Sequence, residues 1–238
     1  VSDNEGALAL YKKFGFEKYR ARVSVRDPTK PEKYFGSDTL WETAEKALIE
    51  NVEKWGAPYF VGEGEAAFYG PKIDIMLEDA IGREWQLTTV QLDFTQPENF
   101  DLSYTGEDGK EHRPAVLHVA ILGSFERFMG ILIEHYAGAF PFWLAPEQIR
   151  ILPVSQQFET YARSVYEKLR HAGYRVHLDD SNDTLGKKIR NAELMKIPIM
   201  CILGEKEASA DKVSVREYAT KKQSEMALDE IEPWLRLQ

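Results

Sequence analysis

The sequence has little cysteine, no long apolar run and no excess of positive charge. Its single cysteine, Cys201, lies in the apolar segment IPIMCIL, which excludes an internal disulfide and favours a small buried side chain over a nucleophile or metal ligand. No apolar run approaches the roughly 20 residues that cross a bilayer. The start, VSDNEGALALYKK, lacks the basic residues and apolar core of a secretory leader. We therefore expect a cytoplasmic location and no membrane partner.

The chain is acidic, with 39 Asp and Glu residues against 30 Lys and Arg residues and a formal net charge of -9. This balance disfavours a protein that binds nucleic acid nonspecifically through bulk positive charge. Basic residues nevertheless cluster locally, because Lys187, Lys188 and Arg190 lie in LGKKIRNAELMK, and Arg216 lies in VSVRE. The cluster indicates either a basic patch on an acidic molecule or an ordinary solvated helix face.

Composition and length predict a folded protein with one large or two ordinary domains. The chain has 238 residues, of which 43% are hydrophobic and 12% aromatic. Apolar periodicity predicts helices over 4–14 and 39–55, and strands over 19–25, 68–79, 83–94, 100–106 and 113–122. The Asp108-Gly109 step is typical of a tight hairpin turn. The first part of the chain is thus expected to form an antiparallel sheet with flanking helices.

The segment AGAFPFWLAPEQ, residues 137–148, is rich in glycine and proline and predicts a boundary between two domains, 1–140 and 147–238. Beyond it, short apolar strands alternate with helical segments of 10 to 18 residues. This rhythm indicates an α/β domain with a mixed sheet and helices on both faces. In such sheets ligands tend to bind at the carboxyl ends of the strands. The fold class is therefore α/β in the broad sense that includes α+β.

Residues 118–136, HVAILGSFERFMGILIEHY, place an arginine at a strand-to-helix junction. The strand ends in Leu122-Gly123-Ser124, and Arg127 falls in the first turn of the helix that follows. Gly123 permits close approach of a ligand or a second backbone, and Ser124 is a suitable helix cap. A guanidinium held there suits a polyphosphate or carboxylate in one orientation. The alternative is a buried helix with one solvated or ion-paired arginine.

Three long segments occur in the order FYGPKIDIMLEDAIGREWQLTTVQLDF, SYTGEDGKEHRPAVLHVAILGSFERFMGILIEHYAGAFPFWLAP and LDDSNDTLGKKIRNAELMKIPIMCILGEKE. Together they resemble the C-terminal half of the threonyl-tRNA synthetase family, a class II family, over roughly residues 30–235. The resemblance implies a partial class II catalytic domain over 1–140 and an anticodon-binding domain over 147–238. In the complete enzyme, a homodimer, it implies ATP-dependent activation of threonine and transfer to threonine tRNA.

The resemblance also implies residue roles. Arg127 matches the motif 3 arginine that contacts the ATP phosphates with Mg²⁺ present, and Gln86 matches a catalytic position beside the nucleotide. Positions that bind substrate are matched by Tyr69, Lys72, Thr89, Gln91 and Ser124. His118 matches one of three ligands of a zinc ion that holds the amino and hydroxyl groups of threonine and so rejects valine. Anticodon-binding positions are matched by Asn182, Lys188, Arg190, Glu207 and Arg216.

Each of these residues also has a structural alternative. His118 could be a hydrogen-bonded structural histidine, Tyr69 and Gln91 could be residues at the edge of the core, and Lys72 could be an exposed strand lysine. For the Lys187, Lys188 and Arg190 cluster, the resemblance favours contact with the tRNA backbone.

The sequence departs from the family in several respects. Motif 3 is present, but motifs 1 and 2 and the other two zinc ligands are not, so the zinc site is incomplete and we expect the chain alone to be inactive. Thr88 replaces a usual glycine and is expected to intrude on the active site or change the strand twist, and Val119 replaces an arginine at the substrate edge. The alternative hypothesis is a non-catalytic, synthetase-like protein that binds tRNA or has a regulatory role. A metabolic enzyme unrelated to tRNA is a third, weaker interpretation.

Overall fold

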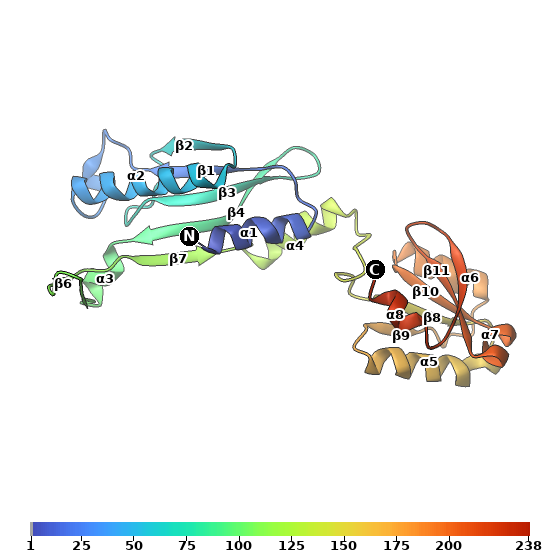
Figure 1. Cartoon of the computed structure of the whole chain (residues 1–238). Helices are drawn as coiled ribbons and strands as arrows, with labels where there is room; N and C mark the ends of the chain where they lie inside the picture. The colour runs from blue at the N-terminus through green and yellow to red at the C-terminus, as the bar shows by residue number, and fades with distance from the viewer. Residues whose placement is uncertain (1) are drawn as a thin grey trace. The chain divides into compact units, whose positions relative to one another are not determined.

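A computed structural model describes residues 2–238, which form two compact units. The first unit ends at Glu134 and the second runs from His135 to Gln238. Each unit contains a five-stranded sheet of its own (Figure 1). No helix within the described residues is both long and apolar enough to cross a membrane.

The sheet of the first unit has the order β2-β1-β3-β4-β7. Its strands are β1 (Tyr19–Val25), β2 (Tyr59–Glu63), β3 (Lys72–Glu78), β4 (Glu84–Asp93) and β7 (Val116–Ala120). The helices of this part are α1 (Ser2–Lys13), α2 (Asp38–Trp55), α3 (Thr95–Asn99) and α4 (Phe125–His135), with a 3-10 turn at Pro31–Lys33. A short hairpin, β5 (Tyr104–Thr105) and β6 (Glu111–His112), extends between β4 and β7. Gly109, with φ of 72°, lies in its turn and confirms the hairpin expected at Asp108-Gly109.

The sheet is antiparallel as expected except for one pair of strands. β1 and β2 run parallel, whereas the pairs β1–β3, β3–β4 and β4–β7 are antiparallel. The reason is the connection, because α2 carries the chain back along the sheet before β2 begins. Ser37 accepts a hydrogen bond from the Leu40 N–H at the start of α2, and Gly56, with φ of 67°, ends the helix.

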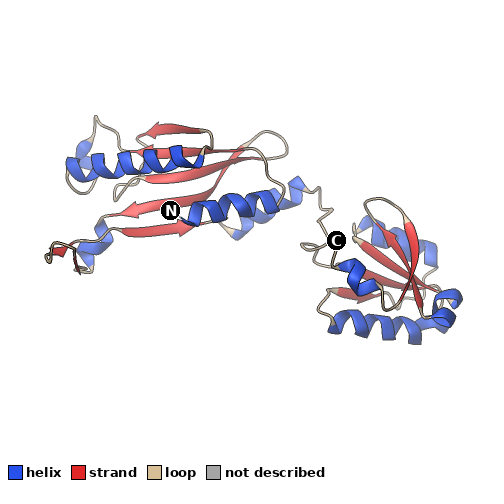
Figure 2. Cartoon of the chain, viewed as in Figure 1, coloured by secondary structure: helices blue, strands red, loops and turns tan. Residues whose placement is uncertain are grey.

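The helices α1 and α2 cover one face of this sheet. Val52 of α2 packs in one apolar cluster with Ala21, Val23 and Ile73 of the strands. Figure 2 shows the two helices, in blue, in front of the strands of this sheet. Tyr11 of α1 reaches the side chain of Thr88 in β4. Because side chains alternate along a strand, the residues between these point to the opposite face, which α1 and α2 leave uncovered. We call this second face the open face.

The second unit has a mixed sheet in the order β12-β11-β10-β8-β9, as the sequence predicts. The strands are β8 (Ile149–Pro153), β9 (Val176–Leu178), β10 (Ile199–Leu203), β11 (Lys212–Glu217) and β12 (Gln223–Ala227). The helices are α5 (Glu159–His171), α6 (Leu185–Leu194), α7 (Glu205–Ala210) and α8 (Ile231–Leu235), with a 3-10 turn at Gln156–Phe158. β9, β8 and β10 are parallel, and β11 and β12 are antiparallel to their neighbours.

Helices cover both faces of the second sheet. On one face α5 and α8 pack over a cluster that includes Ile149, Ile151 and Cys201. On the other face Ala192 of α6 packs against Leu152 and Met200. Cys201 is therefore a buried core residue, as expected, and burial raises the pKa of its thiol to about 12.

Candidate functional site

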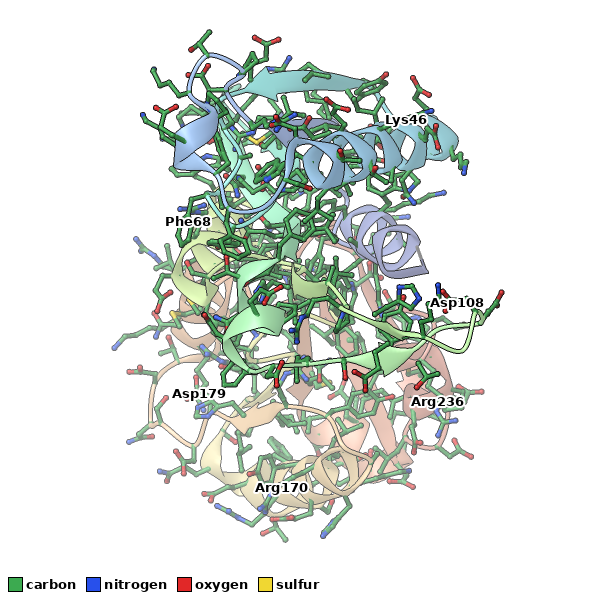
Figure 3. The ribbon with its side chains drawn as sticks, turned by 90° about the vertical axis from the view of Figure 1, so that its left-hand side faces the viewer. Lys46, Phe68, Asp108, Arg170, Asp179 and Arg236 are labelled. Atoms are coloured by element: carbon green, nitrogen blue, oxygen red, sulfur yellow. The ribbon has the colours of Figure 1, made fainter. Side chains whose placement is uncertain are left out.

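The open face of the first unit brings polar side chains from four strands into register. In one row Lys72 of β3 pairs with Gln91 of β4, which pairs with His118 of β7. In the next row Arg22 of β1 pairs with Asp74, which pairs with Thr89. Figure 3 labels Phe68, which precedes Tyr69, and Lys46 of α2 on opposite sides of the first unit. Polar residues far apart in the sequence thus form one continuous surface.

A β-bulge turns Gln86 onto this surface. Thr88 pairs with Ile75 and Gln86 pairs with Met76, so Leu87 is an extra residue in β4. Without the bulge, Gln86 and Thr89 would point to opposite faces. With it, Gln86 Nε2 lies 2.9 Å from Thr89 Oγ1.

Asp74 is the centre of a hydrogen-bond network on the open face, and it is fully buried. Its Oδ2 accepts from Arg22 Nη2 (2.9 Å), Ser24 Oγ (3.2 Å) and Lys72 Nζ (2.5 Å), and its Oδ1 accepts from Gln86 Nε2 (2.7 Å) and Thr89 Oγ1 (2.8 Å). Arg22 also donates to Gln86 Oε1 at 3.0 Å and lies 3.5 Å from Glu65. The network joins three of the residues expected in the site, Lys72, Gln86 and Thr89.

Tyr69, Gln91 and His118 form a second group beside this network. The Tyr69 hydroxyl donates to Gln91 Oε1 at 3.2 Å, and the Tyr69 and His118 rings lie edge to face with centroids 6.4 Å apart. His118 Nε2 lies 2.8 Å from Asp93 Oδ2. Burial raises the pKa of Asp93, but the hydrogen bonds from His118 and from the backbone N–H groups of Gln96 and Thr95 outweigh it, and the net pKa is lowered.

The residues present fit one position of a zinc site. A carboxylate that pairs with one ring nitrogen commonly orients a metal-ligating histidine, and Asp93 pairs with His118 in this way. Catalytic zinc requires three protein ligands. No suitable group of three or more His, Cys, Asp or Glu residues occurs in the described part of the chain. These residues alone therefore do not form a zinc site.

Arg127 lies beside the bulge. Its Nη1 donates to the backbone carbonyl of Gln86 at 2.8 Å, and its backbone N–H donates to Ser124 Oγ at 3.3 Å, so Ser124 caps α4 as expected. Gly123 has φ of 68°. A Cβ there would lie 3.3 Å from the carbonyl of Leu87. Close packing of this glycine on the bulge therefore sets the position of Arg127.

The structure corrects the expectations for Thr88 and Val119. Thr88 is only 1% exposed and lies on the helix-covered face, where its hydroxyl bonds Tyr11 Oη at 2.5 Å and the carbonyl of Ile121. It does not intrude on the open face. Val119 alternates with His118 and pairs with Val90, so its side chain also points away from the open face. Neither substitution alters the composition of that face.

The second unit places its expected site residues in different environments. Asn182 and Arg190 are exposed, and their side chains form no hydrogen bond or ion pair with residues 2–238. Glu207 accepts the N–H of Gly204 at the start of α7. Arg216 donates to Glu193 Oε1 of α6 at 2.9 Å. This hydrogen bond is the main reason that the pKa of Glu193 is lowered.

Lys188 differs from the expected surface position. It is 3% exposed, and its Nζ donates to the carbonyls of Asp179 at 3.0 Å and Pro153 at 3.3 Å. Pro153 is the last residue of β8 and Asp179 follows the last residue of β9, so the ammonium satisfies two carbonyl acceptors at the carboxyl ends of neighbouring strands. Lys187, by contrast, is exposed and paired with Asp183 at 2.8 Å. The basic cluster therefore does not form one exposed face.

Sequence reasoning missed Asp74, Arg22, Asp93 and Glu193. The available signal was an acidic residue at a strand position flanked by isoleucines, as in KIDIM, because such a residue must find donors when the sheet forms.

Comparisons with known proteins match the two units of the chain to two known domain families. Residues 5–136 match the tRNA synthetase class II core domain (G, H, P, S and T), and residues 148–238 match the anticodon binding domain. Threonine–tRNA ligases are similar: the protein of Deinococcus radiodurans is 51% identical over 94% of this chain and 35% of its own length. That of Synechococcus elongatus is 53% identical over 90% of this chain and 35% of its own length.

Solved structures show the same fold. The RNA binding domain of threonyl-tRNA synthetase from Cryptosporidium parvum Iowa II superposes with a TM-score of 0.90 and 36% identity, covering 98% of this chain and 58% of that one. A putative threonyl-tRNA synthetase from Aeropyrum pernix gives a TM-score of 0.75 and 30% identity, over 99% of this chain and 57% of that one. The chain spans about a third of the length of the curated relatives it matches, 35% for both of those above.

Proposed function

Because this chain belongs to the class II tRNA synthetases, and within them to the threonyl-tRNA synthetase family, we propose that it provides part of the active site and the anticodon-binding unit of a threonine–tRNA ligase. The complete enzyme would activate threonine with ATP and transfer it to threonine tRNA. It would act as a homodimer in the cytoplasm. We assign residues 1–140 to the catalytic domain and 147–238 to the anticodon-binding domain.

The observation that carries this proposal is the open face itself. Lys72, Gln91 and His118 lie in one row across three strands, with Tyr69 hydrogen-bonded to Gln91. This surface offers donors for a carboxylate and acceptors for an ammonium or hydroxyl group, which are the three groups of threonine. Thr89 in the adjacent row completes the substrate-binding set.

Arg127 and Gln86 supply the nucleotide side of the proposed site. One guanidinium nitrogen of Arg127 is held by the Gln86 carbonyl, and the remaining donors would bind a phosphate beside the bulge. Ser124 contributes by capping α4. The Mg²⁺ that accompanies ATP would neutralise charge on the leaving pyrophosphate. Zinc, for which the described residues offer His118 but no group of three ligands, is assigned no step.

In the second unit we assign tRNA contact to Asn182, Arg190, Glu207 and Arg216. Arg190 and Asn182 are exposed, and Arg216 is held by Glu193 in a fixed orientation. We assign Lys188 an indirect role, since its ammonium bonds the carbonyls of Pro153 and Asp179 near the loop that carries Asn182.

A filter-binding assay tests the proposal with threonine tRNA and a non-cognate tRNA. The chain should prefer threonine tRNA. Arg190→Ala should weaken binding and reduce the slope of log K against log salt concentration by about one, as for the loss of one phosphate contact. Arg170→Ala, an exposed arginine of α5, is the matched control and should bind as the wild type does. Equal affinity for both tRNAs would contradict the proposal.

The non-catalytic, synthetase-like alternative gains no support from Thr88 or Val119, because both point away from the open face. Threonine-dependent pyrophosphate exchange separates the two hypotheses when the chain is combined with a polypeptide that supplies class II motifs 1 and 2. Exchange restored by the combination supports the ligase, and its absence supports the alternative.

A further inference from the structure

We propose that Asp74 is a positioning residue that sets the hydrogen-bond polarity of the open face. Through its contacts it holds the Lys72 ammonium, which only donates, in one place, and it leaves the Thr89 hydroxyl only an acceptor for a ligand. The inference rests on the proposed function, because it interprets these groups as contacts for the carboxylate or phosphate and for the ammonium or hydroxyl group of the substrate.

The orientation of the Gln86 amide follows from the chemistry of its neighbours. The Asp74 carboxylate only accepts hydrogen bonds, and the Arg22 guanidinium only donates them. The NH2 group of Gln86 must therefore face Asp74 Oδ1 at 2.7 Å, and its carbonyl oxygen must face Arg22 at 3.0 Å. The reverse orientation would place a donor against a donor and an acceptor against an acceptor.

The same reasoning fixes the Thr89 hydroxyl. A hydroxyl has one proton and two lone pairs. The proton is directed to Asp74 Oδ1 at 2.8 Å, and one lone pair accepts from Gln86 Nε2 at 2.9 Å. One lone pair remains, so Thr89 accepts a hydrogen bond from a ligand and has no proton to donate to one.

Lys72 offers a ligand hydrogen-bond donors, whereas Thr89 offers an acceptor. One of its three N–H groups is directed to Asp74 Oδ2 at 2.5 Å, which leaves two donors for a ligand. The Lys72 ammonium only donates in any case, so the buried carboxylate fixes the place of these donors and makes Thr89, in the adjacent strand, an acceptor. An amino acid with both an ammonium and a carboxylate group complements this pair of positions.

The substitution Asp74→Asn would reverse the polarity of the Thr89 hydroxyl with almost no change in shape. The amide oxygen would turn toward the two cations Arg22 and Lys72, and the amide nitrogen would turn toward Thr89. The Thr89 hydroxyl would then accept from the asparagine, and its own proton would point outward. A donor would face the substrate ammonium group where wild type presents an acceptor.

The test is titration of the full chain with L-threonine, followed by NMR, for wild type, Asp74→Asn and Asp79→Asn. Asp79 is the matched control because its carboxylate is also buried and paired with an arginine, Arg83 Nε at 2.6 Å, but lies at the turn between β3 and β4. We expect Asp74→Asn to weaken binding about tenfold or more, as for loss of a charge-assisted hydrogen bond. We expect Asp79→Asn to leave affinity unchanged, although both variants unfold at lower temperature.

A second measurement separates this inference from the proposed function. The Gln86 side-chain amide signals report the network without a ligand: both protons should be protected from exchange in wild type and Asp79→Asn, and exposed or shifted in Asp74→Asn. Unchanged Gln86 signals in Asp74→Asn, or equal loss of affinity in both variants, would overturn the positioning role. Absence of threonine binding by wild type with the expected Gln86 pattern would contradict the proposed function and leave the positioning role supported.

Discussion

Thr88 and Thr89 are neighbours in β4, yet their hydroxyl groups serve opposite faces of the sheet. Thr88 bonds Tyr11 on the helix-covered face, and Thr89 bonds Asp74 on the open face. The first contact stabilises the packing of α1, and the second fixes a group that a ligand would meet. In the sequence, Thr88 looks like a substitution in the active site. In the structure, it instead stabilises the packing of α1 against the sheet.

We predict that Tyr11→Phe destabilises the first unit by about 1–2 kcal/mol, because the buried Thr88 N–H loses its acceptor and the Thr88 hydroxyl keeps only the carbonyl of Ile121. Native-state hydrogen exchange of the β4 amides measures the effect. Tyr19→Phe is the control, since the Tyr19 hydroxyl forms no hydrogen bond with the described residues. Equal effects of the two substitutions would show that the Tyr11–Thr88 bond contributes nothing specific.

Lys188 and Arg190 should respond to substitution in opposite ways. Lys188→Met leaves two carbonyls without their donor inside the second unit and should cost about 1–3 kcal/mol of stability. Arg190→Ala removes an exposed side chain and should change stability by less than about 0.5 kcal/mol while it weakens tRNA binding. Thermal unfolding and filter binding check both statements, and a stable Lys188→Met variant with weak tRNA binding would contradict them.

Cys201 gives a prediction for pH dependence. Burial raises its pKa from 9.0 to about 12, so the folded state keeps the thiol proton while the unfolded chain loses it. Stability is unaffected below pH 9 and falls by about 1.4 kcal/mol per pH unit above it, up to the folded pKa. In denaturant titrations, the stability of wild type should therefore decrease more steeply above pH 9 than that of Cys201→Ala. Parallel curves would contradict the shift.

Among the elements, the contact of the β7–α4 junction with the bulge of β4 determines where Arg127 lies. Gly123 occupies a left-handed conformation against Leu87, and α4 begins two residues later. The bulge and the glycine act together, because one moves Gln86 onto the open face and the other brings Arg127 to the Gln86 carbonyl.

Two glycines near and in α4 should therefore respond oppositely to alanine. Gly123→Ala places a Cβ in a left-handed conformation and 3.3 Å from a carbonyl oxygen, and should cost about 1–2 kcal/mol. Gly130→Ala lies inside the helix with open space around it and should stabilise by about 0.5–1 kcal/mol. Differential scanning calorimetry measures both, and shifts of the same sign would refute this account of the junction.

Most helices and strands could be predicted from periodicity and caps, as for α2, where Ser37 and Gly56 mark both ends. The strands β2 and β12 escaped prediction because they are edge strands with exposed, partly polar residues, and they become strands only through their partners. The helices α3 and α7 have 5 and 6 residues, too few to show a helical period. The parallel β1–β2 pairing depends on the path of α2, which local sequence does not specify.

At the scale of the whole molecule, the proposed functions divide between the two units. Substrate and nucleotide binding are assigned to the open face of the first unit, and tRNA contact to α6, α7, β11 and the loop before α6 in the second. The sequence motifs indicated Lys72, Thr89 and Gln91, and the strand register brings them together. Asp74 and Arg22 could not be inferred in this way, because 52 residues separate them and only sheet pairing joins them. Lys188 was misplaced since a helix pattern does not show which of two adjacent lysines is buried.

The most direct test of the proposed active site is chemical-shift mapping of the isotope-labelled chain with a non-hydrolysable threonyl-adenylate analogue. We predict saturable shifts at Gln86, Thr89, Gln91 and Arg127, which line the open face and the adjoining junction. Residues of the helix-covered face, such as Val23 and Val52, should not shift. Shifts confined to the helix-covered face or to the second unit, or no binding at millimolar analogue, would contradict the assignment of the open face as part of a threonine–tRNA ligase active site.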